Sequence, residues 1–190
     1  MIDRLKHEPD TYCMLLGDLT NNSTRRSIGS GVYDDIMPPL DQVQECCRIF
    51  EPVRDKILCG LSGNHEDRTY KESGISVARL CFYNLGLEHL YSDTTAVLFL
   101  RTGAKHGSRK GVVKGHKGDP LLYTIYCTHG NGGGRKPGAK INRLVDYGSI
   151  VDTDLVICGH THFPAVARQV CFRADTRTHK LVEVDRLYVN

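Results

Sequence analysis

The stretch Ile57-Leu58-Cys59-Gly60-Leu61-Ser62-Gly63-Asn64-His65 decides how this chain folds. It begins as a short apolar run and ends in a glycine, an amide and an imidazole. A short apolar run closed by turn residues is typical of a buried strand in a largely parallel sheet. In open α/β sheets, ligands bind beyond the carboxyl ends of the strands. We therefore expect Asn64 and His65 to lie at a binding site.

Three other apolar runs end in the same way. Tyr12–Leu16 leads into Gly17-Asp18, Leu121–Cys127 leads into His129-Gly130, and Leu155–Cys158 leads into Gly159-His160-Thr161-His162. Because the carboxyl ends of parallel strands share one edge, we expect all these polar side chains to converge on one cleft. Carboxylate, amide and imidazole ligands without a thiolate suit Mn²⁺, Fe or Zn²⁺ rather than a structural cysteine site. The pattern predicts a metal centre, and one for two ions.

The composition is that of an ordinary globular protein, with 190 residues, 25% charged and 40% hydrophobic. We expect one domain over residues 1–190. The net charge of +3 is too small to indicate nucleic-acid binding by itself. No apolar run approaches the roughly 20 residues of a membrane helix. Residues 1–10 are mostly polar, unlike a signal peptide, so we expect a cytoplasmic protein without a membrane partner.

The eight cysteines lack the spacing of a zinc or redox motif, because no C-x-x-C pair occurs. Four of them lie inside the apolar runs, namely Cys13, Cys59, Cys127 and Cys158. Buried free cysteine behaves as a small apolar residue. We interpret these residues as reduced core thiols, which disfavours a cysteine-based redox or zinc protein.

The spacing of apolar residues and the positions of glycine and proline predict the order of helices and strands. Helices are expected over 1–8, 40–53, 75–86 and 139–149, and strands over 12–16, 56–62, 94–102, 121–127, 155–158, 164–172 and 180–189. The buried helix residues are expected to be Leu40, Val43, Cys47, Phe50, Val77, Leu80, Cys81 and Leu85.

Two glycine-rich basic loops, 103–119 and 131–138, flank the later motifs. They contain Lys105, Lys110, Arg135 and Lys136, which can attract a phosphate-bearing partner. The plainer interpretation of each residue is a solvated loop charge.

The predicted roles of the site residues follow from extended backbone. Neighbouring side chains then point in opposite directions, so Asn64 can offer its amide oxygen to a metal while His65 faces the substrate as a proton donor. His160 and His162 would share one side, about 7 Å apart at Cα. Two metals of a hydrolytic pair lie about 3.5–4 Å apart, so each imidazole can bind a different ion.

Each motif also has an ordinary explanation when it is taken alone. An aspartate after glycine is commonly a turn or helix cap, Asn-His a surface turn, and His-x-His a chance pair in a loop. We expect Glu66 and Asp67 to be solvated charges or to support His65 from behind. The conjunction of four motifs at four strand exits favours the metal centre.

These motifs, in this order, resemble those of the calcineurin-like metallophosphoesterase superfamily. Its G-D-x-x, G-N-H-[DE], single H and G-H-x-H patterns correspond to Gly17–Thr20, Gly63–Glu66, His129 and Gly159–His162. The resemblance implies an α/β sandwich of two mixed β-sheets flanked by helices, and a two-metal centre that hydrolyses phosphate esters.

The resemblance also implies roles for single residues. Asp18 would bridge both metals, Asn64, His129 and His160 would complete one site, and His162 would belong to the other, with His65 as the catalytic histidine. The family's opening D-x-H motif is expected ahead of Met1, and the chain is expected to be truncated at both ends. One metal site is then well formed and the other half built.

We therefore expect a metal-dependent hydrolase of phosphate monoesters or diesters, with a nucleotide or nucleic acid among its candidate substrates. The alternative is a catalytically silent metal- or nucleic-acid-binding fragment. A D-x-H motif in the reading frame upstream of Met1 would favour the enzyme.

Overall fold

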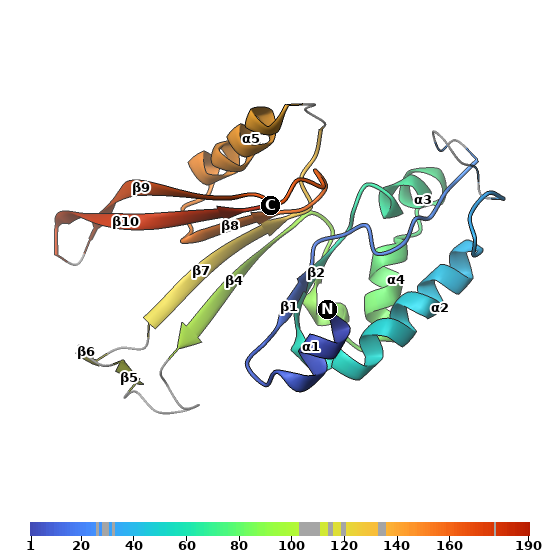
Figure 1. Ribbon diagram of the computed structural model, residues 1–190, viewed down its shortest axis with the longest axis horizontal. Helices are drawn as coiled ribbons and strands as arrows, with labels where there is room; N and C mark the ends of the chain where they lie inside the picture. The colour runs from blue at the N-terminus through green and yellow to red at the C-terminus, as the bar shows by residue number, and fades with distance from the viewer. Residues whose placement is uncertain are drawn as a thin grey trace. The chain divides into compact units, whose positions relative to one another are not determined.

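The computed structural model contains two compact units (Figure 1). The N-terminal unit comprises residues 1–96 and 128–131, and the C-terminal unit comprises residues 97–127 and 132–190. The structure describes residues 1–25, 27, 31, 33–102, 111–113, 116–118, 121–132, 136–176 and 178–190. The expectation of one domain over residues 1–190 stays a prediction.

The N-terminal unit is built on a three-stranded parallel sheet of order β1-β2-β3. Its strands are β1 (Cys13–Leu15), β2 (Ile57–Leu61) and β3 (Tyr91–Ser92). Its helices are α1 (Ile2–His7), α2 (Pro39–Phe50), α3 (Glu66–Ser73) and α4 (Val77–Asn84), with 3₁₀ turns η1 (Glu51–Lys56) and η2 (Glu88–Leu90). Loops that follow β1 and β2 carry the first two sequence motifs.

The core of this unit forms where helices pack on the sheet. Its buried apolar residues are Leu5, Leu15, Val43, Cys46, Phe50, Val53, Ile57, Val77, Cys81, Phe82 and Leu85. Gly60 lies directly against the Phe82 ring, and a Cβ there would overlap the ring. Helix α4 ends at Asn84, and the left-handed Gly86 (φ +71°) just beyond its cap is typical of a helix C-terminus.

Two predicted helix faces need correction. Leu40 is 62% exposed and Leu80 is 38% exposed, although both were expected to be buried. On α2 the deeply buried cysteine is Cys46 rather than Cys47, and on α4 the sequence analysis missed Phe82, which is fully buried. Apolar spacing alone identifies the helix, but its rotation against the sheet depends on the neighbours.

The C-terminal unit contains a five-stranded mixed sheet of order β4-β7-β8-β10-β9. Its elements are β4 (Thr95–Thr102), the hairpin β5 (Gly111–Val113) and β6 (His116–Gly118), β7 (Leu121–Thr128), α5 (Pro137–Ile150), β8 (Leu155–Cys158), β9 (Val166–Asp175) and β10 (Lys180–Val189). Strand β10 is parallel to β8 and antiparallel to β9. Helix α5 lies along the sheet (Figure 1), and Leu144 packs with Val156, Cys158 and Tyr188.

The apolar runs suggested that the four motif-bearing strands form one largely parallel sheet, and this expectation is wrong. Strands β1 and β2 belong to the parallel sheet, while β7 and β8 belong to the mixed sheet. The predicted fold class is nevertheless confirmed: the molecule is α/β, with two sheets flanked by helices. Within loop 103–119, the structure describes only the short hairpin β5-β6.

All eight cysteines are free thiols, and five of them are buried, including Cys59, Cys127 and Cys158. Cys13 is only half-buried. Burial raises the pKa of the Cys158 thiol to about 11, so it is protonated at neutral pH and packs as an apolar residue. Among the helices that the structure describes, none has the length and apolar character needed to cross a membrane.

Candidate metal centre

The loop after β1 turns sharply at Gly17 and Asp18, which both have left-handed backbone (φ +93° and +52°). A Cβ on Gly17 would lie 2.6 Å from the Gly63 backbone and 2.7 Å from His129 Nδ1. A Cβ on Gly63 would in turn overlap Asp18. These two glycines therefore let the loops after β1 and β2 touch. Left-handed backbone at a non-glycine residue such as Asp18 is strained and is concentrated at functional sites.

We expect Gly17→Ala to destabilise the N-terminal unit far more than Gly74→Ala. Both glycines have positive φ, but a Cβ at Gly74 (φ +72°) meets no atom within 4 Å. Gly74→Ala should cost about 1 kcal/mol, the backbone strain alone. Gly17→Ala adds collisions with backbone and with His129, which we expect to cost at least about 1 kcal/mol more. Urea unfolding of the two variants makes the comparison, and equal losses would contradict the close approach.

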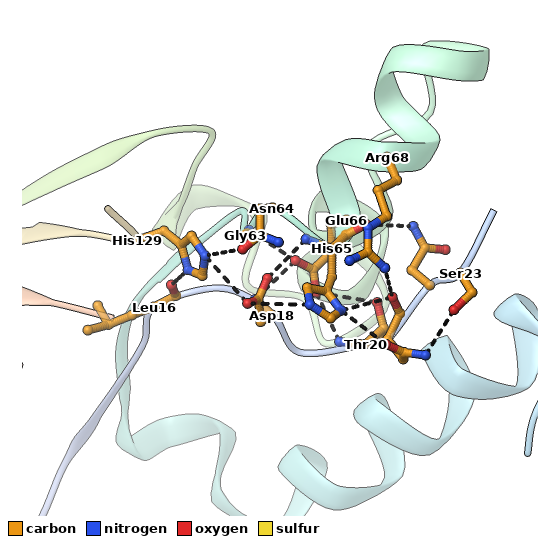
Figure 2. A network of polar contacts seen from close by, with 12 residues as sticks. Leu16, Asp18, Thr20, Ser23, Gly63, Asn64, His65, Glu66, Arg68 and His129 are labelled. Atoms are coloured by element: carbon orange, nitrogen blue, oxygen red, sulfur yellow. Dashed lines mark hydrogen bonds and ion pairs between the residues drawn. The ribbon is translucent and has the colours of Figure 1, made fainter. Parts of the chain in front are cut away.

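The carboxylate of Glu66 ties the two loops together (Figure 2). It is 1% exposed and accepts hydrogen bonds from the backbone N–H groups of Asp18 (3.0 Å), Thr20 (2.9 Å) and Gly63 (2.9 Å). The Thr20 hydroxyl also donates to it at 3.3 Å. Of the two expectations for Glu66, the solvated charge is therefore wrong, and the carboxylate supports the loop that carries His65. Buried backbone N–H groups in a loop lack the hydrogen-bond acceptors that a sheet provides. The Glu66 carboxylate is the acceptor for such groups in both loops.

Three electron-rich atoms converge beside this clamp. His129 Nε2 lies 3.0 Å from Asn64 Oδ1 and 3.5 Å from Asp18 Oδ2 (Figure 2). His129 Nδ1 lies 2.6 Å from the Leu16 carbonyl oxygen, which can only accept, so Nδ1 carries the proton. With Nδ1 held by this carbonyl, Nε2 faces an amide oxygen and a carboxylate oxygen. Such a group is stabilised by a shared cation.

The donor set fits a divalent metal ion. Atoms that each bind one ion at about 2.1 Å lie no more than about 4 Å apart, and both distances from His129 Nε2 satisfy this limit. A backbone carbonyl that holds the second ring nitrogen of a histidine is a common support of metal ligation. His129 is 6% exposed, which limits competition from water for its ring. One nitrogen and two oxygen donors are a plausible partial ligand set for a divalent cation.

His65 lies beside this group but has different partners (Figure 2). Its backbone N–H donates to Asp18 Oδ1 at 3.0 Å. Its Nδ1 lies 3.1 Å from both the main-chain and the side-chain oxygen of Asn21, so Nδ1 carries the proton. Its Nε2 lies 4.0 Å from Asp18 Oδ2, and the side chain is 29% exposed. Nε2 is thus left to exchange a proton with a bound molecule.

The sequence analysis derived the opposite directions of the Asn64 and His65 side chains from extended backbone, and that reason is wrong. His65 has helical φ and ψ (−72°, −48°) and directly precedes α3. Asn64 lies in the turn before it. The backbone is therefore a turn entering a helix rather than an extended segment. A helical turn also separates neighbouring side chains, and here it directs Asn64 to His129 and His65 to Asn21.

The last motif, in the C-terminal unit, is also folded rather than extended. His160 (φ +64°) and His162 (φ +50°) both have left-handed backbone. The N–H of Thr161 between them donates to the Gly159 carbonyl at 2.7 Å, which closes a tight turn. The spacing of about 7 Å expected from an extended strand therefore does not apply. The turn lines an open pocket of about 390 Å³ together with Phe163, Pro164 and Asn190.

The predicted basic residues are only partly described. Lys136 is exposed and directly precedes α5. Arg135, Lys105 and Lys110 lie outside the described residues.

Comparison with known proteins identifies a family for this chain. A family model for calcineurin-like phosphoesterases matches residues 1–164. The chain belongs to the calcineurin-like phosphoesterase family. No curated protein and no solved structure matches the chain significantly. Calcineurin-like phosphoesterases are metal-dependent hydrolases of phosphate esters, and the loops after β1 and β2 carry their G-D and G-N-H motifs.

The sequence did not indicate the roles of two residues beside these donors. Asn21 orients His65 from three positions after Asp18, where the sequence suggested only a polar loop. Glu66, which follows the G-N-H motif, was expected either to be solvated or to support His65, and its bonds to the N–H groups of both loops were not foreseen. A search for acceptors of the N–H groups in both loops would have singled it out, because it is the acid closest in sequence to Gly63.

Proposed function

We propose that this chain hydrolyses phosphate esters, with metal-binding residues from the loops after β1, β2 and β7 and with His65 as the proton donor. The observation that supports it best is the convergence of Asp18, Asn64 and His129, with the ring of His65 alongside but differently held. Membership of the calcineurin-like family supports the reaction class.

The proposed metal ligands are Asp18, Asn64, His129 and His160 for one ion, and Asp18 with His162 for a second. The first three are supported by their geometry. His160 and His162 are assigned from the order of the family motifs. Divalent cations held by these residues would offset the negative charge of the phosphate and lower the pKa of a bound water molecule. We propose Mn²⁺, Fe or Zn²⁺, since the donors are nitrogen and oxygen.

His65 acts on the leaving group. Asn21 holds the Nδ1 proton, so a doubly protonated His65 would give its Nε2 proton to the departing oxygen and remain as the neutral ring protonated at Nδ1. The two acceptors on Asn21 fix the plane of the ring before substrate arrives, which is the preorganisation that proton transfer needs. Arg135 and Lys136 are proposed to attract the phosphate group.

The test is metal-dependent turnover of three probes: an aryl phosphodiester, an aryl phosphomonoester and single-stranded DNA. Each is assayed in Mn²⁺, Zn²⁺ or Fe²⁺ buffer and after chelation. We expect hydrolysis of at least one probe that is lost on chelation and restored by metal. Tight metal binding without turnover of any probe would overturn the enzyme and favour the silent binding module.

We expect His65→Ala to lower turnover by about 10²- to 10⁴-fold while metal affinity stays within about twofold of the parent. The reason is that His65 Nε2 is placed to transfer a proton, whereas the converging donors come from other residues. Calorimetric titration with Mn²⁺ measures affinity and the most active probe measures turnover. His89→Ala, an exposed histidine of the same unit, is the control. Loss of metal from His65→Ala would make His65 a ligand.

We also propose a cytoplasmic location. The support is the set of eight free thiols, since such thiols persist in a reducing compartment.

A further inference from the structure

The Gly159–His162 turn is fixed at Thr161, the residue between the two histidines. Its N–H donates to Gly159, its carbonyl accepts from the Lys140 ammonium at 2.7 Å, and its hydroxyl accepts from the Asn190 side-chain amide. The same amide donates to the Phe163 carbonyl at 2.6 Å. All polar groups of Thr161 are therefore engaged, although Thr161 itself is not a candidate ligand.

The backbone on either side of Thr161 needs such support. Left-handed φ is unfavourable for residues with a Cβ, and here it recurs at His160 and His162 within three residues. Strained backbone of this kind persists only where the surroundings over-determine it. The contacts from α5 and from Asn190 reach the turn from separate segments of the C-terminal unit.

Lys140 is placed against the preference of its own helix. It is the fourth residue of α5, and a cation in the first turn opposes the helix dipole. Its ammonium also lies 5.5 Å from the centre of the Phe163 ring, within the range of a cation–π contact. Lys140 is half-buried, so its long side chain is held rather than solvated. These contacts point to a role in the turn and not in helix α5.

We propose that Lys140, together with Asn190, is a positioning residue that fixes the backbone turn presenting His160 and His162. This inference rests on the proposed function, in which those two histidines bind metal. The ammonium acts through the Thr161 carbonyl, so it sets the direction of both imidazoles without binding the metal or the substrate.

The experiment compares Lys140→Met, Lys140→Arg and Lys180→Met in the full chain. Methionine keeps the length of the stem and removes the donor, and arginine restores a donor and the ring contact. Lys180→Met is the control, because Lys180 is an exposed lysine on β10 of the same unit. The first measurement is the ring Cε1–Hε1 NMR signal of each histidine in metal-free protein. The second is Mn²⁺ affinity by calorimetry.

We expect Lys140→Met to move or broaden the His160 and His162 signals and leave that of His89 unchanged. Metal affinity should fall about 10- to 100-fold, the usual cost of losing a support behind a ligand. Lys140→Arg should restore both, and Lys180→Met should match the parent. Unchanged His160 and His162 signals in Lys140→Met, or failure of Lys140→Arg to restore them, would overturn the proposal.

A second variant and a metal-free measurement test the proposal if the first experiment fails. If Lys140→Met does not fold, Asn190→Ala removes the contacts from the other segment and should move the same two signals. If the parent chain binds no Mn²⁺, Zn²⁺ or Fe²⁺, the proposed function fails, but the NMR comparison in metal-free protein still tests the positioning role.

Discussion

Replacing His129 by alanine should weaken Mn²⁺ binding by more than about 100-fold, beyond the usual cost of losing a support behind a ligand. The imidazole is the shared neighbour of the other two donors, at 3.0 Å from Asn64 and 3.5 Å from Asp18. Its loss leaves one amide and one carboxylate oxygen from the N-terminal unit. Calorimetric titration measures the change, and turnover should fall with it.

His129→Ala needs a control for folding, because the ring is almost fully buried. His129→Gln keeps much of the volume and removes the imidazole, and His89→Ala again serves as the exposed comparison. Both alanine variants should give the far-UV circular dichroism of the parent. Parent-like metal affinity in folded His129→Ala would exclude His129 as a ligand.

Replacing Glu66 by alanine should lower the free energy of unfolding by about 3 kcal/mol or more. The carboxylate is buried and accepts from the N–H groups of Asp18, Thr20 and Gly63, and each donor left without a partner costs about 1–3 kcal/mol. Metal affinity should fall as well, because the loops that carry Asp18 and Asn64 lose their common acceptor. Urea unfolding with and without Mn²⁺ measures both effects.

The matched control is Glu72→Ala, on the same helix. Glu72 is exposed and accepts a hydrogen bond from the Thr24 hydroxyl, so its loss should cost less than about 1 kcal/mol. Glu66→Gln keeps the shape of the side chain but offers one acceptor oxygen and brings an NH₂ toward backbone donors. It should therefore be less stable than the parent by an amount between those of the two alanine variants. If Glu66→Ala proves as stable as Glu72→Ala, Glu66 does not stabilise the loops after β1 and β2 as proposed.

The strands and the order of motifs could be predicted from the sequence, because apolar runs closed by glycine have few alternatives. Helix α3 could not, since its eight residues contain a single buried side chain and that residue is Glu66. An amphipathic pattern was therefore absent. The division of four motif strands between two sheets was also missed, because periodicity does not report which strands pair.

The sequence identified the candidate residues by their chemical type, but it did not predict their backbone conformation. Extended chain was assumed for Asn64-His65 and for His160–His162, because both follow strands. The structure has a helix entry at the first and a left-handed turn at the second. Both turns depend on tertiary partners, Glu66 for one and Lys140 for the other, which lie outside the local sequence window.

Residues 128–131 belong to the N-terminal unit although 31 residues of the other unit, 97–127, precede them in the chain. During synthesis, residues 1–96 leave the ribosome with the β1 and β2 loops but without His129. The contact from His129 to Leu16 spans 113 positions, so it cannot form until residue 129 has been synthesised. Of the three donors His129 is made last, so a nascent or cleaved chain ending at residue 96 lacks the imidazole of this group. The three donors can therefore come together only in a chain that extends past residue 129.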